Sequence, residues 1–211
     1  SGIIASQALA KSPADGYTLM VTQAALLSYN QALFPKLPYD PIKDFAPISL
    51  LAALDIWLVS PPSVPAKNFR EFVAYAKSQP GKLSFSATGG TSGLPYIAAV
   101  LVRDRAGMDL TFVPYKANDQ ATTDLLAGRL QVFFDAVPSS IQQVRAGKLR
   151  PLAVLGPNRM TQMPEVPTIS EEGIAEATGV AWNGMVGRSG TPPEIITRLH
   201  REAVAVMRAP A

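Results

Sequence analysis

Short apolar runs and helical spacings take turns along most of the chain. Apolar runs bounded by Gly, Pro or Asp predict strands at residues 19–21, 48–60, 83–86, 111–113, 131–134, 152–155 and 180–186. Apolar residues three and four apart predict helices at residues 3–9, 69–76, 95–105 and 119–126, a short helix that ends before Gly147, and a last helix that opens at Thr191. The prolines between residues 35 and 47 predict an irregular surface segment.

Several of these helix starts carry residue types that are typical of N-caps. Asn68 precedes the helix at residues 69–76, Asp119 is placed to cap the helix that Gly128 stops, and Ser139 or Ser140 is placed to cap the next one. Thr168 and Glu171 have the spacing of a capping box. Each of these side chains offers an oxygen to backbone N–H groups that the first turn leaves unpaired.

Strand and helix alternate about six times, which is typical of α/β architecture with mostly parallel sheets. Residues 67–155 predict a self-contained α/β unit, whereas the two flanking segments are each too small to form a domain. We therefore expect two lobes. Residues 1–53 and 176–211 form an incomplete lobe 1, and residues 54–175 form lobe 2. The long run at 48–60 is one crossing between them, and a ligand cleft is expected between the lobes.

Composition narrows the functional classes. The 211 residues are 47% hydrophobic and 17% charged, which is the balance of a globular chain. No apolar run approaches the ~20 residues that span a bilayer. The net charge is +3 without a Lys/Arg cluster, so we expect no nucleic-acid partner. The chain has no cysteine and one histidine, His200, which excludes disulfides, thiol nucleophiles, cysteine zinc sites and a three-histidine metal site. We expect no metal and no cofactor.

The strongest local motif is a glycine-rich loop that joins a strand to a helix. It contains Thr88, Gly89, Gly90, Thr91 and Ser92. Glycines let a backbone approach a ligand closely, and free N–H groups at a helix start favour an anion. The loop matches neither a dinucleotide-binding fingerprint nor a P-loop. It is predicted either to cradle a carboxylate or to be an ordinary turn between strand and helix.

Three further positions are candidates for ligand contact, each beside a structural alternative. Thr22, Gln23 and Ala24 follow a strand, where their polar groups could meet a ligand oxygen, but Thr22 could equally cap a helix. Asp135 follows an apolar strand and could accept from a ligand donor or cap the next turn. Trp182 could wall a pocket or pack in the core.

The sequence gives little indication of a group of catalytic residues. A Ser-His-Asp triad would need His200, which lies on the polar side of the last predicted helix, and the aspartates show no paired spacing. An enzyme on this scaffold, a transferase or a lyase acting on a carboxylated substrate, remains the alternative, with a pocket base near Asp135 or Lys116. The motifs favour a binding protein without catalytic residues.

Eight short strings then carry a resemblance across essentially all 211 residues. They are 13–19 (PADGYTL), 37–41 (LPYDP), 43–47 (KDFAP), 113–116 (VPYK), 124–128 (DLLAG), 134–135 (FD), 146–154 (AGKLRPLAV) and 164–168 (PEVPT). In this order and spacing the chain resembles the Bug family, the periplasmic solute receptors of tripartite tricarboxylate transporters. Each string alone is weak, but eight in register are specific.

The resemblance implies a two-lobed α/β fold of the type II periplasmic-binding-protein class, truncated at both ends. It implies a ligand that is a di- or tricarboxylate, an acidic amino acid or an aromatic acid. It places the loop after Val21 and the loop 88–92 among the binding loops, Asp135 at a position that faces the cleft, and Trp182 near it. The implied partners are a small-molecule carboxylate and membrane transporter subunits, with the receptor a monomer in the periplasm. A ligand-sensing accessory of a signalling system is a further alternative.

Two departures from the family pattern matter. The signal peptide, the first strand with its ligand loop, and part of the C-terminal helical region are expected to be missing from this chain. The glycine-rich loop also continues as Gly93-Leu94-Pro95-Tyr96, whereas many relatives have a Ser/Asn-rich loop followed by a histidine. Tyr96 could take over a polar contact or close the pocket against an aromatic ligand.

Overall fold

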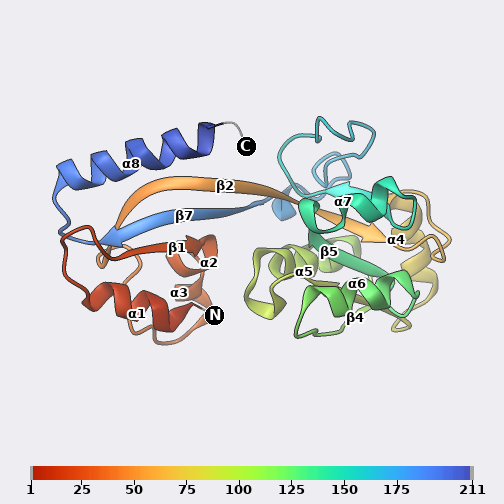
Figure 1. The fold of residues 1–211 in the computed structure, drawn as a ribbon. Coiled ribbons are helices and arrows are strands. Elements are labelled where there is room, and N and C mark those ends of the chain that lie inside the picture. The colour runs from red at the N-terminus through yellow and green to blue at the C-terminus, as the bar shows by residue number, and fades with distance from the viewer. Residues whose placement is uncertain (1, 210–211) are drawn as a thin grey trace. The chain divides into compact units, whose positions relative to one another are not determined.

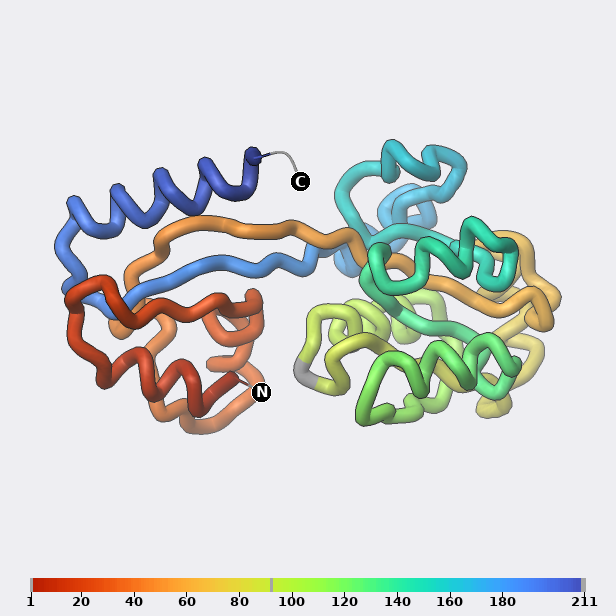
Figure 2. The backbone as a smooth tube through the Cα atoms, viewed as in Figure 1, coloured from red at the N-terminus to blue at the C-terminus, as the bar shows by residue number. Residues whose placement is uncertain are grey.

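The structure is a computed structural model that describes residues 2–209, apart from the side chain of Ser92. The chain divides into two compact units. Unit 1 comprises Ser1–Ala53 and Trp182–Ala211, and unit 2 comprises Leu54–Ala181. The chain enters unit 2 along one long strand and leaves it along another, a path that can be followed in Figure 2.

Helices and strands follow one another as labelled in Figure 1. The strands are β1 (Leu19–Gln23), β2 (Phe45–Ser60), β3 (Leu83–Ala87), β4 (Leu110–Phe112), β5 (Val132–Ala136), β6 (Arg150–Val154) and β7 (Val180–Arg188). The α-helices are α1 (Ile3–Lys11), α2 (Ala24–Leu27), α3 (Asn30–Leu33), α4 (Phe69–Ser78), α5 (Leu94–Ala106), α6 (Asn118–Leu126), α7 (Val137–Arg145) and α8 (Pro193–Arg208). Two short 3₁₀ turns are η1 (Gly90–Ser92) and η2 (Ala175–Ala177).

Unit 2 is built on a mixed sheet. β3 pairs in parallel with β4 and with β5, whereas β2 runs antiparallel to both β5 and β6. The register places Trp57 opposite Asp135 and Ala87 beside Phe134. Because β3 and β5 are parallel neighbours, the segments that follow them meet at the same edge of the sheet.

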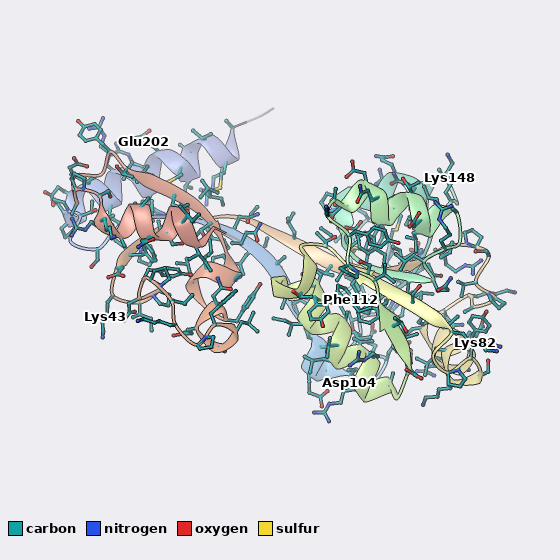
Figure 3. The ribbon with its side chains drawn as sticks, turned by 90° about the horizontal axis from the view of Figure 1, so that it is seen from below. Lys43, Lys82, Asp104, Phe112, Lys148 and Glu202 are labelled. Atoms are coloured by element: carbon teal, nitrogen blue, oxygen red, sulfur yellow. The ribbon has the colours of Figure 1, made fainter. Side chains whose placement is uncertain are left out.

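Helices cover both faces of this sheet. Successive strand residues point to opposite faces, so one face packs under α4 and α5 and the other under α6 and α7. The first cluster includes Ile56, Leu58, Phe85 and Phe134, and the second includes Trp57, Val59 and Phe133, all with at most 1% of their surface exposed. Figure 3 shows the consequence in the labelled side chains of unit 2: Phe112 lies within the unit, and Lys82, Asp104 and Lys148 lie at its periphery.

Unit 1 contains β1, the first part of β2 and all of β7 except its first two residues, with β1 antiparallel to β7. Met20 and Thr22 of β1 face a cluster of buried residues that comprises Leu9, Met20, Leu26, Tyr39, Phe45 and Val186. The amphipathic helix α8 contains no buried residue, although the sequence predicts a continuous apolar stripe along it. Val206, a member of that stripe, is 75% exposed.

Two expectations about architecture need correction. Among the named strands of the described residues, β3 pairs in parallel with β4 and β5, whereas β2 runs antiparallel to β5 and β6, and β7 runs antiparallel to β1. Residues 176–181 belong to unit 2, although the sequence pattern predicts them in lobe 1. The Gly179 N–H donates to the Leu155 carbonyl at 2.8 Å, and Ala177 is buried in the cluster that contains Leu155.

The caps show where local patterns succeed and fail. Asn68 caps α4 by accepting from the Glu71 N–H at 2.9 Å, as predicted. The prediction for Asp119 is wrong, because Ala117 is the N-cap and Asp119 lies in the first turn of α6. The prediction for Ser139 or Ser140 is also wrong, because α7 begins earlier, at Val137.

The predicted capping box of Thr168 and Glu171 forms with both of its reciprocal bonds. The Thr168 N–H donates to the Glu171 carboxylate at 2.7 Å, and the Glu171 N–H donates to the Thr168 hydroxyl at 3.2 Å. The segment continues as turns and not as an α-helix. Among residues 2–209 no helix combines the length and the apolar composition that crossing a bilayer requires.

Candidate functional site

The glycine-rich loop of unit 2 runs from the end of β3 to the start of α5. Gly89 and Gly90 adopt positive φ angles of 82° and 67°, which favour glycine. Gly93 has no such angle but is needed for space, because a Cβ there would lie 2.9 Å from the Thr88 carbonyl oxygen. The loop is tied to the sheet by the Thr88 N–H, which donates to the Phe134 carbonyl at 3.0 Å.

The same loop presents backbone donors. Among the described residues, no acceptor bonds the backbone N–H groups of Gly89, Gly90 and Thr91. The first turn of α5 lies directly after them, and an anion is favoured near the start of a helix. Ser92 contributes its backbone to η1, and its side chain lies outside the described part of the chain. The loop thus presents a short run of backbone N–H groups without an acceptor among the described residues.

Asp135 lies beneath this loop at the end of β5 and is fully buried, with 0% of its surface exposed. One carboxylate oxygen accepts from the Thr88 hydroxyl at 2.6 Å, and the other accepts from the Ser140 hydroxyl at 2.6 Å. Ser140 in turn accepts from the Trp57 indole N–H at 3.0 Å. Both carboxylate oxygens are therefore engaged inside unit 2.

Burial raises the pKa of the Asp135 carboxyl above its ordinary value, because the charged form loses hydration. The hydroxyl groups of Ser140 and Thr88 oppose that shift by bonding the charged form. A raised pKa in a pocket would suit a general base. Here Asp135 has no exposed surface, and both of its carboxylate oxygens accept from hydroxyl groups. The carboxylate therefore cannot reach a substrate proton, although its pKa is raised.

The other predicted site residues gather at one end of the β1–β7 pair in unit 1. The register sets Thr22 opposite Gly184 and Gln23 opposite Asn183. The Trp182 ring packs beside Gly184, where an added Cβ would lie 3.3 Å from the ring, so Thr22 and Trp182 share a face of the pair. Thr22 and Ala24 are buried, whereas Gln23 and Trp182 keep exposed surface.

Within unit 2 the structure thus brings together Thr88, residues 89–92 and Asp135, as expected from parallel β3 and β5. Two participants in this network were not expected there: Trp57 and Ser140. Ser140 carried a signal as a polar residue near a helix start, but its partner was unknown. Tyr96 does not enter this network; its ring packs edge-on against Phe112 with centroids 4.7 Å apart.

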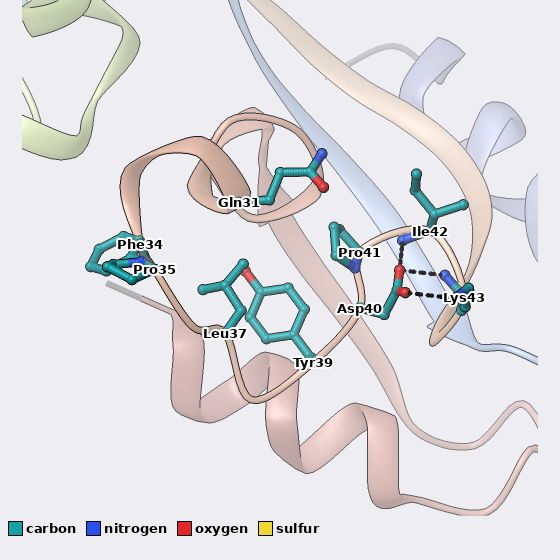
Figure 4. A pocket seen from close by; sticks show the side chains of 9 residues that line it. All are labelled: Gln31, Phe34, Pro35, Leu37, Tyr39, Asp40, Pro41, Ile42 and Lys43. Carbon is teal, nitrogen blue, oxygen red and sulfur yellow. Dashed lines mark hydrogen bonds and ion pairs between the residues drawn. The ribbon is translucent and has the colours of Figure 1, made fainter.

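Two pockets lie away from these residues. One cavity of about 480 Å³ in unit 1 is shown in Figure 4 and is lined by Gln31, Phe34, Pro35, Leu37, Tyr39, Asp40, Pro41, Ile42 and Lys43. Its carboxylate, Asp40, accepts from the backbone N–H groups of Lys43 and Ile42, which lower its pKa. Another of about 320 Å³ in unit 2 lies between α4, the end of α5 and residues 172–174.

Within the part of the chain that the structure describes, no group of three His, Asp or Glu side chains is placed to hold a metal ion. The polar groups around the glycine-rich loop are hydroxyls, backbone N–H groups and one buried carboxylate. This set suits an anion better than a cation, because the free groups are hydrogen-bond donors.

Comparison with known sequences is consistent with this chemistry. A family model described as "Tripartite tricarboxylate transporter family receptor" matches residues 1–211. The "UPF0065 protein in tcbD-tcbE intergenic region" of Pseudomonas sp. (strain P51) is 36% identical over 211 residues, which are 99% of this chain and 62% of that protein. "Protein BugT" of Bordetella pertussis is 32% identical over 100% of this chain and 64% of its own length. The chain therefore spans less than two thirds of these relatives.

Solved structures of related receptors have the same fold as this chain. "R. palustris Rpa4515 with adipate" superposes with a TM-score of 0.86 at 30% identity, over 99% of this chain and 69% of that one. "MatC (Rpa3494) from Rhodopseudomonas palustris with bound malate" gives a TM-score of 0.81 at 30% identity, over 98% of this chain and 69% of that one.

Proposed function

Since the chain belongs to the tripartite tricarboxylate transporter family of receptors, we propose that it captures a small carboxylate for a membrane transporter of this type. The resemblance to Bug receptors and the expected α/β fold of the periplasmic-binding-protein type are confirmed. The family is one of receptors and not of enzymes, which leaves the transferase or lyase alternative without support. Since the chain spans under two thirds of its relatives, the activity, ligand and partners of the whole protein are proposals.

The observation that carries the proposal is the set of open backbone donors at Gly89, Gly90 and Thr91. Backbone N–H groups fix the position of an anion without the conformational entropy of a long Arg or Lys side chain. A carboxylate has two oxygens that accept such bonds, and charge-assisted bonds of this type are about twice as strong as neutral ones. A loop of this kind recognises the carboxylate itself and leaves the rest of the ligand to other contacts.

The same proposal assigns ligand contacts to Thr22, Gln23, Ala24 and Trp182 in unit 1. Gln23 keeps exposed surface at the end of β1 and offers an amide that both donates and accepts. Trp182 offers a half-exposed ring, which suits the apolar part of an adipate-like or aromatic acid. The related structures with adipate and with bound malate support the class of small dicarboxylates for this chain.

The family further supports a periplasmic receptor that delivers its ligand to membrane transporter subunits. Related structures are titled "Structure of a periplasmic transporter" and "Structure of periplasmic binding protein BugD". We propose the same compartment for this chain, and we propose that it acts as a monomer without nucleic acid.

Calorimetric titration tests the proposal. The unaltered chain is titrated with adipate, malate, citrate, glutamate and benzoate, and with adipamide as the uncharged counterpart of adipate. We expect at least one acid to bind and adipamide to fail, since neutral amides lack the charge that the loop donors recognise. Binding of none of the acids would contradict the proposal, and equal binding of adipate and adipamide would contradict the role of the loop donors.

A matched pair of glycine variants locates the contact. Gly90→Ala and Gly173→Ala both place alanine at a positive φ, 67° and 89°, and both have open space for the new Cβ. The two variants should therefore lose similar stability. Only Gly90→Ala changes the loop, so we expect only that variant to weaken binding of the acid, by about tenfold for the loss of one charge-assisted bond.

A further inference from the structure

A chain of buried hydrogen bonds lies under the glycine-rich loop and links three strands to one helix. It runs from Trp57 on β2 to Ser140 on α7, then to Asp135 on β5, and ends at Thr88 after β3. Trp57, Asp135 and Ser140 are at most 1% exposed. The strand register brings the members together, because Trp57 is the direct partner of Asp135 and Ala87 is that of Phe134.

The chemistry of the members gives the direction of each bond. An indole N–H only donates, so Ser140 accepts from Trp57 and gives its own hydroxyl proton to Asp135. The Thr88 hydroxyl gives its proton to the other carboxylate oxygen. With Asp135 ionised, both hydroxyl protons are committed. Thr88 then has no proton to donate to an anionic ligand, although the sequence places it among the ligand contacts.

We propose that Asp135 is a positioning residue that holds Thr88, and through it the loop at Gly89–Ser92, in the geometry that receives an anion. This inference rests on the proposed function, because it takes the loop as the anion-binding element. Two hydroxyl donors converge on Asp135, and only a carboxylate accepts from both at once; an amide offers one acceptor and one donor. Ser140, which accepts from Trp57, bonds the carboxylate oxygen that Thr88 does not.

The first test needs no ligand. Amide hydrogen exchange is measured by NMR in the unaltered chain and in Asp135→Asn and Thr88→Val. The reporters are the N–H groups of Thr88 and Gly93, which donate to the Phe134 and Gly90 carbonyls. We expect exchange at both to rise about tenfold in either variant, because the loop loses one buried charge-assisted bond. Unchanged exchange in both variants would overturn the proposal.

Two variants separate positioning from general loss of structure. Thr88→Ser keeps the hydroxyl and should restore exchange at the loop nearly to that of the unaltered chain. Ser86→Ala removes another buried hydroxyl on β3, which donates to the Val113 carbonyl at 2.8 Å and has no bond to Asp135. Ser86→Ala is expected to leave exchange at Thr88 and Gly93 unchanged. A similar rise in Ser86→Ala would mean that any buried hydroxyl of β3 acts alike, and would overturn the proposal.

The second test uses adipate and malate. Asp135→Asn and Thr88→Val should each lower the affinity for the acid that binds by a similar factor, about tenfold, because both substitutions act through the same loop. Loss of binding in Asp135→Asn with full binding in Thr88→Val would show a direct ligand contact by Asp135 and overturn the proposal. If the unaltered chain binds no acid, the proposed function fails, and the exchange rates still decide the positioning role.

Discussion

The two units bury their apolar side chains to very different degrees. Unit 2 covers both faces of its sheet with helices and holds Trp57, Phe72, Phe85, Phe133 and Phe134 at no more than 1% exposure. Unit 1 contains every exposed large apolar side chain of the described residues except Leu126; these are Ile4, Tyr17, Leu19, Val21, Leu33, Ile42, Leu50, Val206 and Met207. Hydrophobic burial is the main favourable term in folding, so most of the stability of this chain is expected in unit 2.

The difference also bears on the candidate contacts. In unit 2 the glycine-rich loop stands on a buried, fully bonded network, which holds it in one geometry. In unit 1, within the part of the chain that the structure describes, the Thr22 hydroxyl makes a single long contact of 3.5 Å, to the adjacent Gln23 carbonyl. The loop of unit 2 is thus held by buried side-chain bonds, a support that the Thr22 hydroxyl lacks among the described residues.

The largest expected effect comes from truncating one apolar side chain in each unit. Phe72→Ala in α4 removes a side chain with 0% exposure, and we expect a loss of about 3–5 kcal/mol in unfolding free energy. Val206→Ala in α8, at 75% exposure, should change it by no more than about 0.5 kcal/mol. Urea unfolding of the intact chain, with hydrogen exchange to read each unit, measures both. Similar losses of unfolding free energy in the two variants would contradict the conclusion that most of the stability lies in unit 2.

A pair of glycine substitutions examines how α8 is held in unit 1. At Gly16, with φ at 80°, a Cβ would lie 2.4 Å from the Ile195 Cγ2 atom at the start of α8. Gly147 in unit 2 has a similar φ of 69° but open space. Gly147→Ala should cost about 1 kcal/mol for the backbone alone, and Gly16→Ala about 2 kcal/mol because Ile195 must move. Equal losses in thermal unfolding would show that the α8 contact adds nothing.

A smaller effect follows from the buried carboxyl of unit 2. Because the pKa of Asp135 is raised in the folded chain above its ordinary value of 3.8, the folded state binds more protons than the unfolded state in that window. Stability therefore falls as pH rises from about 3.8 through the raised pKa. Unfolding free energies measured across this range should show the fall, and Asp135→Asn should lack it. The same slope in both proteins would contradict the assignment.

The smallest effect has the opposite sign and comes from an exposed ion pair. Arg159 and the Thr168 N–H lower the pKa of Glu171 from 4.5 to about 2. Its contribution is present above pH 4.5 and is lost as pH falls through about 2. Glu171→Gln should flatten this acid dependence in unit 2, with Glu165→Gln as a control whose carboxyl makes no ion pair among the described residues. If the unfolding free energy of Glu171→Gln depends on acid pH as strongly as that of the unaltered chain, the acid dependence does not come from Glu171.

Local chemistry determined much of the fold from the sequence. Helical spacing and strand runs located most elements within a few residues, and the Asn68 cap and the Thr168–Glu171 bonds form as their spacing predicts. These features depend on residues at most a few positions apart, whose geometry is set by the backbone itself. Family strings added the type of receptor, since eight of them occur in one register.

Tertiary structure alone decided what the polar residues do. Ser139 or Ser140 was expected as a helix cap, but Ser140 bonds Asp135 and Trp57, the latter 83 positions away in sequence. Thr88 and Asp135 are 47 positions apart and meet only because β3 and β5 are parallel neighbours. The sequence predicts the apolar stripe of α8, but no residue of this helix is buried, because burial depends on what packs against the helix. Side-chain bonds between distant strands follow from sheet register, which short-range patterns do not contain.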